Sequence, residues 1–158
     1  LAAVERLRLA GLPVELDLIE NISREKALER YRQADIAVEQ LLAGSYGTFA
    51  VELMAIGVPV ICYIRNDLVG KYPQPPPIAI ADPLTIDAVL QDLLARPSDW
   101  PAIARRGRAY VEQFHEARLL AQQAITTYRT LRQARNGPLV SAPLTAPQTS
   151  EARVGDAA

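Results

Sequence analysis

The residues best suited to chemistry form one stretch, a loop of small residues at 44–48 (Gly-Ser-Tyr-Gly-Thr) that leads into a helical pattern carrying Glu52. The first backbone N–H groups of such a helix have no partner within the helix. Together with the positive end of the helix dipole, they make a site for an anion. We therefore predict a ligand site formed by the loop and the Glu52 carboxylate, with its binding residues at Ser45, Tyr46, Gly47 and Thr48.

The elements that must position this loop alternate between strand-like and helix-like patterns. Apolar alternation and continuous apolar runs predict strands at 14–19, 35–38, 58–64 and 78–80. Helical spacing predicts helices at 2–10, 24–33, 48–57, 84–95, 98–115 and onward to about 135, with Ser23 and Ser98 as N-caps. This order predicts an α/β fold, with a Rossmann-like parallel sheet and helices on both faces.

The loop 40–47 and the irregular, proline-rich segment 65–77 both follow predicted strands. Ligands of such sheets bind beyond the carboxyl ends of the strands. We therefore expect both segments at the same edge, with 65–77 as a lid or an edge cover. Arg65 is a weaker candidate for an anionic ligand, because an arginine at a strand end is more often solvated.

Other reactive residue types have simpler interpretations. Cys62 lies in an apolar run and is expected to be a buried small hydrophobe. His115 has no Cys, Asp or other His at ligand spacing, so we expect a structural histidine and no metal. Arg105, Arg106 and Arg108 form a basic patch, which is either an exposed helix face or a contact with anionic lipid.

Composition narrows the function further. The chain has 17 Lys and Arg against 18 Asp and Glu, which argues against a nucleic-acid partner. It has one cysteine and no apolar run near the ~18 residues of a membrane span, so we expect a cytoplasmic protein with at most peripheral membrane contact. Because the sequence opens inside a helical pattern, we expect a longer protein upstream. Residues 137–158, rich in Ala, Pro, Ser and Thr, are expected to be a disordered tail.

The stretch from Tyr31 to Ile64 resembles the donor-binding, C-terminal half of GT-B glycosyltransferases, in particular the large family 4 of retaining enzymes. The matching residues are Tyr31, Ala34-Asp35, Tyr46-Gly47, Glu52, Met54-Ala55, Gly57 and Pro59-Val60. Residues 82–131 are similar to the closing part of that family, including the Phe114-His115 junction. The resemblance covers roughly residues 10–132 as an ensemble, and no single short motif carries it.

This resemblance implies roles for individual residues. The family signature is a pair of acids, of which the second accepts hydrogen bonds from the ribose hydroxyls and the first touches the donor sugar. Glu52 fills the second place, and Gly44 stands in the first. Glu39 and Gln40, just upstream, are possible substitutes for the absent acid. The turn at Asn21 and Ile22 occupies the position of the nucleobase contact.

Residues 1–136 are thus interpreted as a nucleotide-sugar-binding domain, one half of a GT-B fold, from a retaining glycosyltransferase. The resemblance implies a nucleotide-sugar as donor, no metal or other cofactor, and an acceptor domain and phosphate-binding residues before residue 1. The chain alone is expected to be inactive. Two alternatives remain: a degenerate binding or assembly module, which Gly44 favours and Glu52 opposes, and another GT-B enzyme such as a sugar-nucleotide epimerase. That epimerase family has a Ser-Gly-Gly-x-x-Glu-Glu-like run, which the loop at 44–52 lacks.

Overall fold

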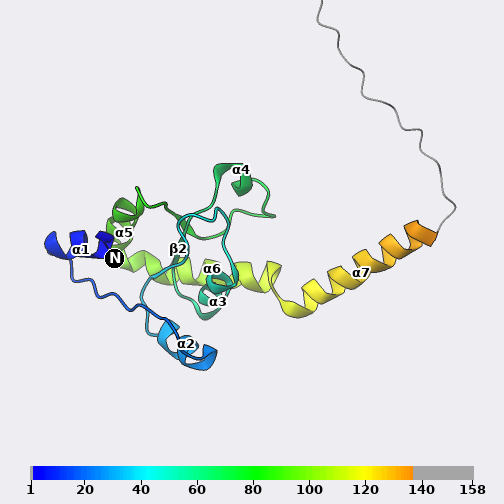
Figure 1. Ribbon diagram of the computed structural model, residues 1–158, viewed down its shortest axis with the longest axis horizontal. Helices are drawn as coiled ribbons and strands as arrows, with labels where there is room; N and C mark the ends of the chain where they lie inside the picture. Colours follow the sequence, from blue (N-terminus) through cyan, green and yellow to red (C-terminus); the bar gives the residue numbers. More distant parts are fainter. Residues whose placement is uncertain (1, 137–158) are drawn as a thin grey trace, which may run out of the picture. The chain divides into compact units, whose positions relative to one another are not determined.

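The computed structural model describes residues 2–136 (Figure 1). The elements follow in the order α1 (Ala2–Leu9), α2 (Arg24–Tyr31), β1 (Ala37–Val38), α3 (Thr48–Ile56), β2 (Val60–Cys62), α4 (Asn66–Val69), β3 (Ala79–Ile80), α5 (Ile86–Ala95), η1 (Pro97–Asp99), α6 (Trp100–Phe114) and α7 (Ala117–Asn136). The chain divides into one unit covering Leu1–Ala121 and a second that begins at Gln122, so the division falls within α7. The predicted tail 137–158 lies outside the described residues.

The sheet has three strands in the order β1-β2-β3, and both pairings are parallel. Ala37 pairs with Val60 and Ile61 with Ala79, which places the ends of β1 and β2 at one edge. Consecutive parallel strands need a crossover connection, and α3 supplies it between β1 and β2. The prediction of an α/β fold with a parallel sheet is confirmed.

The central strand β2 divides the core into two layers. Val60 and Cys62 join a cluster with α3 and α6 that includes Leu53, Met54 and Tyr110. Ile61 points the other way, into a cluster with Ile86 and Leu93 of α5. Because successive side chains of a strand alternate between faces, a continuous apolar run is what a strand covered on both sides requires. Helices therefore lie on both faces, as predicted.

Helix α3 approaches α6 closely at Gly107. A Cβ atom on this residue would lie 3.3 Å from the Met54 side chain, so glycine lets the two helices approach without displacing Met54. Gly57 ends α3 in the left-handed conformation (φ 85°), and its N–H reaches back to the last turn. The helix that carries Glu52 is thus packed along one side and firmly terminated.

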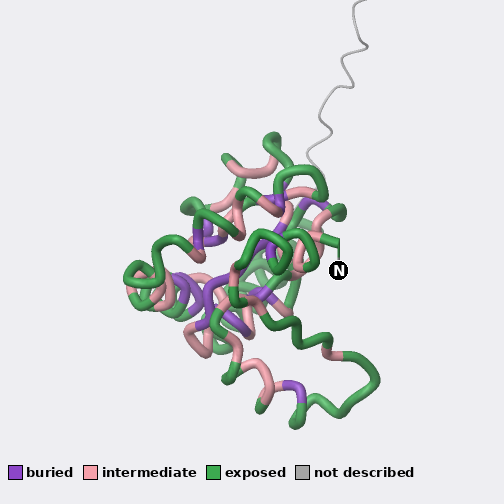
Figure 2. The backbone as a smooth tube through the Cα atoms, turned by 90° about the vertical axis from the view of Figure 1, so that its left-hand side faces the viewer, coloured by how far each residue is buried: buried purple, intermediate pink, exposed green. Residues whose placement is uncertain are grey.

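The strand predicted at 14–19 is absent from the structure, so this prediction is wrong. The segment between α1 and α2 is irregular and largely exposed (Figure 2). The Leu18 residue within it is 58% exposed. Alternating apolar residues make a strand only where a neighbouring strand supplies hydrogen bonds. Among the described residues β1 pairs only with β2, and no strand pairs with this segment.

The other predicted strands are present but shorter. The run 58–64 forms a strand only at Val60–Cys62. The strand begins after Pro59, which has no N–H to donate and contributes only its carbonyl, an acceptor for the Ala37 N–H at 2.9 Å. The strands predicted at 35–38 and 78–80 are present only at Ala37–Val38 and Ala79–Ile80. The irregular segment 65–77 contains the short helix α4, which the sequence analysis missed.

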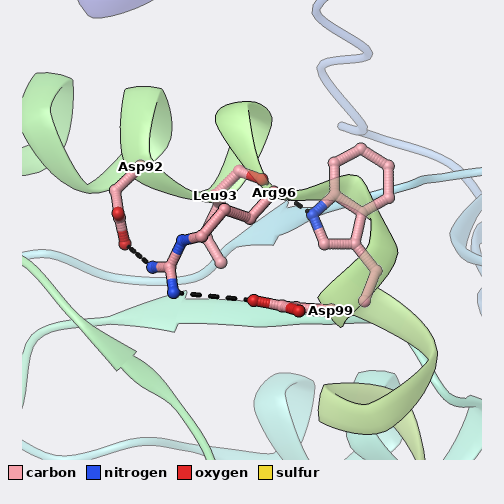
Figure 3. A network of polar contacts seen from close by, with 5 residues as sticks. Asp92, Leu93, Arg96 and Asp99 are labelled. Atoms are coloured by element: carbon pink, nitrogen blue, oxygen red, sulfur yellow. Dashed lines mark hydrogen bonds and ion pairs between the residues drawn. The ribbon is translucent and has the colours of Figure 1, made fainter.

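The two predicted N-caps have different outcomes. The Ser23 side chain accepts from the Lys26 N–H and caps α2, as predicted. Ser98 caps nothing, because it lies within η1 and α6 begins at Trp100. The junction is held instead by Arg96, which pairs with Asp92 and Asp99 (Figure 3). The Trp100 indole N–H donates to the Leu93 carbonyl at 2.9 Å, so it ties α6 to α5.

Candidate functional site

The loop between β1 and α3 meets the segment 65–77 at the carboxyl edge of the sheet. The Arg65 N–H donates to the Gly44 carbonyl at 2.9 Å, and the hydroxyls of Ser45 and Tyr72 lie 2.8 Å apart. Both segments therefore lie at the edge where ligands of parallel sheets bind. This juxtaposition agrees with the sequence analysis.

Gln40 braces the loop from inside. Its amide oxygen accepts from the Leu42 and Ala43 N–H groups, and its amide nitrogen donates to the carbonyls of Ser45 at 2.7 Å and Tyr63 at 3.0 Å. One side chain thus replaces the backbone pairing that an irregular loop lacks. Gln40 was a weaker candidate for ligand binding, and in the structure its amide is committed to the loop.

Glu39 is also committed internally. Its carboxylate accepts from the Gly47 N–H at 2.8 Å and from the Cys62 thiol at 2.8 Å. Burial and the adjacent Glu39 carboxylate raise the pKa of Cys62 to about 12, so the thiol stays protonated and donates. The expectation of a buried Cys62 is confirmed, but the thiol also has a polar role that the apolar context of the sequence did not indicate.

The N-terminus of α3 keeps part of the predicted anion site. Gly47 is the N-cap residue, and its N–H is taken by Glu39. The N–H groups of Thr48 and Phe49 have no hydrogen bond among residues 2–136. Donors at the start of the helix thus remain open to an anion, while the Glu39 carboxylate holds the loop before them.

Tyr46 fixes the outer side of the loop. Its hydroxyl lies 3.1 Å from the Tyr110 hydroxyl and 3.0 Å from Nε2 of His115, and its ring stacks on Tyr72 at 5.1 Å. Burial raises the pKa of Tyr46 and lowers the pKa of His115, because each charged form loses hydration. His115 thus has the structural contact that was expected. Its contact with the loop was not foreseen, because the two residues are far apart in sequence.

Glu52 is paired with Arg24, a residue that the sequence analysis did not single out. Nη2 and Nε of Arg24 lie 2.6 Å and 3.1 Å from Oε1 of Glu52. The hydrogen bond to Glu52 raises the pKa of Arg24. Arg24 begins α2 directly after Ser23, and the predicted base-contacting turn, with Asn21 at φ 54°, lies just before it. The structure therefore brings this turn to the same side as Glu52.

Gly44 has no room for a side chain. Its φ is 89°, and a Cβ atom there would lie 2.6 Å from Cδ of Arg65. The aliphatic part of Arg65 thus lies across the position where an acid would point. The Arg65 guanidinium pairs with Asp67 at 2.7 Å and 2.9 Å, so it is already neutralised.

Two further features lie away from this loop. A cavity of about 530 Å³ opens at the opposite edge of the sheet, beside the first residues of β2 and β3, and its lining includes none of the predicted binding residues. In the basic patch, Arg105 and Arg106 are exposed, and Arg108 bonds to Glu112 and to the Ala55 carbonyl at 2.6 Å.

Within residues 2–136 no three His, Cys, Asp or Glu side chains come together to hold a metal ion. In the same range no helix has both the length and the apolar content to cross a bilayer.

Comparison with known proteins gives one clear likeness. No protein-family model matches the chain, and no curated protein matches it. Among solved structures, it is similar to a sucrose-phosphate synthase from Thermosynechococcus elongatus, with a TM-score of 0.60 and 22% sequence identity. The match covers 83% of this chain and 34% of that protein. The likeness shows the fold. It confirms the predicted fold class, a Rossmann-like half of a GT-B fold, and this chain spans about a third of the length of its neighbour.

Proposed function

We propose that this domain binds the nucleotide part of a nucleotide-sugar, as the donor-binding half of a retaining glycosyltransferase. The observation that carries the proposal is the geometry at one sheet edge. A braced loop presents the Thr48 and Phe49 N–H groups there, and the Glu52 carboxylate lies about one helical turn farther on.

The chemistry of a nucleotide-sugar suits these groups. The N–H groups and the helix dipole favour the diphosphate, whose charge increases as the sugar departs. A carboxylate accepts hydrogen bonds from the two adjacent ribose hydroxyls. The domain would contribute positioning and electrostatic stabilisation, with the acceptor held by another domain of the same protein.

The test is a calorimetric titration of uridine, guanosine and adenosine diphosphates and their glucose derivatives into the full chain. We expect one series to bind, and Glu52→Ala to weaken its affinity by about tenfold, or ~1.4 kcal/mol. Glu29→Ala, which removes an exposed acid of α2, is the matched control and should change nothing. Absence of binding by the wild type, or equal affinity of the Glu52→Ala variant, would refute the proposal.

A non-catalytic sugar-nucleotide-binding module is the second candidate. It is favoured by Gly44, whose side-chain position is filled by Arg65. Such a module would bind the nucleotide-sugar and depend on Glu52 in the same way. Unlike a glycosyltransferase, it would never cleave the nucleotide-sugar, so no nucleoside diphosphate would be released even when the acceptor domain is present. Measuring that release over hours with the complete protein separates the two.

A further inference from the structure

The Arg24–Glu52 pair leaves half of the carboxylate open. Both Arg24 nitrogens contact the same oxygen, Oε1, at 2.6 Å and 3.1 Å. Among residues 2–136, no hydrogen bond engages Oε2 of Glu52. A carboxylate has about four lone-pair sites. The guanidinium therefore fixes one oxygen and leaves the other free to accept.

The two side chains stand on helices that hold them at a defined distance. Ala50 and Leu53 bury α3 in the core on either side of Glu52. The N-cap at Ser23 fixes the start of α2, and the rings of Tyr31 and Phe49, 4.9 Å apart, tie α2 to α3. The pair is thus unlike a surface pair within one helix, because it joins two separately anchored elements.

The exposures of the two partners differ. The Glu52 side chain is 22% exposed and that of Arg24 is 71% exposed. The arginine side chain thus lies largely in solvent, whereas most of the glutamate side chain is covered. A ligand that approaches Glu52 therefore meets a carboxylate already held in one orientation.

We propose that Arg24 is a positioning residue, which holds Oε1 of Glu52 so that Oε2 accepts from the ribose hydroxyls of a ribonucleoside diphosphate. This inference rests on the proposed function and narrows its ligand to nucleotides with a free 2′,3′-diol. Without Arg24, the Glu52 side chain would populate several rotamers, and the ligand would have to order it on binding. Arg24 acts through Glu52 and makes no contact with the ligand.

The experiment compares each ribonucleoside diphosphate with its 2′,3′-dideoxy analogue, using uridine, guanosine and adenosine forms and calorimetry on the full chain. We expect Arg24→Gln to weaken the ribonucleotide by about tenfold and to leave the dideoxy analogue unchanged. In a Glu52→Gln background, Arg24→Gln should cause no further loss, because the two residues act as a unit. Arg24→Lys should recover part of the affinity.

Arg30→Gln is the matched control, since Arg30 lies on the same helix and pairs with Asp17 instead. It should alter neither nucleotide. An equal loss for the ribose and dideoxy forms would show direct contact with the phosphate or base and would overturn the inference. Unchanged binding in Arg24→Gln would also overturn it while leaving the proposed function intact. A wild type that binds no nucleotide would refute both.

Discussion

Two irregular stretches of this chain differ in how their backbone is held. The loop 39–47 and the segment 11–22 both lie outside regular structure. In the loop, Glu39 and Gln40 satisfy backbone N–H and carbonyl groups, with Cys62 as a further partner. In the segment, a side-chain contact of this kind is the Arg8 guanidinium, which donates to the Val14 carbonyl at 2.9 Å.

The difference shows that a loop gains a defined shape from polar side chains placed beside a strand end. An unpaired polar group costs free energy where water is excluded, so each of these bonds favours one backbone path. In the exposed segment, water can satisfy the same groups, so fewer bonds within the protein favour one backbone path. The four predictions below test whether the loop is the more strictly specified of the two.

The largest effect is expected at the glycines with positive φ. Gly44→Ala forces an L residue into φ 89° and places a Cβ atom 2.6 Å from Arg65, whereas Gly11→Ala at φ 81° meets nothing within 4 Å. We expect Gly44→Ala to lower the free energy of unfolding by about 2–4 kcal/mol and Gly11→Ala by about 1 kcal/mol. Urea denaturation measures both.

The Arg65→Ala change in the Gly44→Ala background should reduce the loss to that of Gly11→Ala. Gly70→Ala is the control, since Gly70 has φ −78° and nothing within 4 Å of its added Cβ atom. Equal losses at Gly44 and Gly11 would contradict the steric explanation.

The next effect is expected at Glu39. Glu39→Ala leaves the Gly47 N–H and the Cys62 thiol without their acceptor, and we expect a loss of about 1–3 kcal/mol in the free energy of unfolding. Glu15→Ala removes an exposed acid from the segment, and we expect less than about 0.5 kcal/mol. If the two variants unfold at the same urea concentration, the loop is not braced as described.

A pH-dependent effect is expected at His115, the sole histidine of the chain. Burial lowers its folded pKa below the usual 6.5, so the neutral form favours the folded state. This stabilisation is present above about pH 6.5 and is lost as the pH falls through the folded pKa. In His115→Gln, thermal unfolding measured between pH 8 and pH 5 should depend less on pH than in the wild type. Identical slopes would rule out a contribution from this residue.

The smallest effect is expected in the segment. Leu18 is 58% exposed and lies on no strand, so Leu18→Ser should change the free energy of unfolding by less than about 0.5 kcal/mol. A loss above 1.5 kcal/mol would show that the segment pairs with a neighbour in solution. Leu53→Ala, which truncates a fully buried core side chain, should lower the free energy of unfolding by about 2–5 kcal/mol. It serves as the reference for the effect of a core substitution.

Local patterns predicted those parts of the fold that depend on local causes. The run around Ile61 reads as a strand covered on both faces, and Ser23 reads as a cap, because each depends on neighbouring residues. The segment 14–19 failed because strand formation requires a partner that its own sequence does not contain. The cap predicted at Ser98 failed because residues 97–99 form the short helix η1, so α6 begins only at Trp100.

In the site too, features with local causes were predicted and those that need distant residues were not. The placement of the loop and segment 65–77 at one edge followed from the order of the elements, whereas the pairing of Glu52 with Arg24 joins residues that the sequence separates by 28 positions. The hydrogen bonds of Glu39 and Gln40 within the protein also depend on Cys62 of β2 and on Tyr63, which follows it. A single sequence carries no signal for such pairs. The roles of Ser45, Thr48 and Ile22 remain predictions.

The buried thiol of Cys62 can report how often the structure around it opens. Cys62 is the single cysteine of the chain, has no exposed surface and is held in the unreactive protonated form. An alkylating reagent can therefore modify it only when the cover over it has opened. The alkylation rate under native conditions thus reports how often that cover, including the loop, departs from its closed arrangement. A ligand that binds the closed loop would slow this rate in proportion to its occupancy.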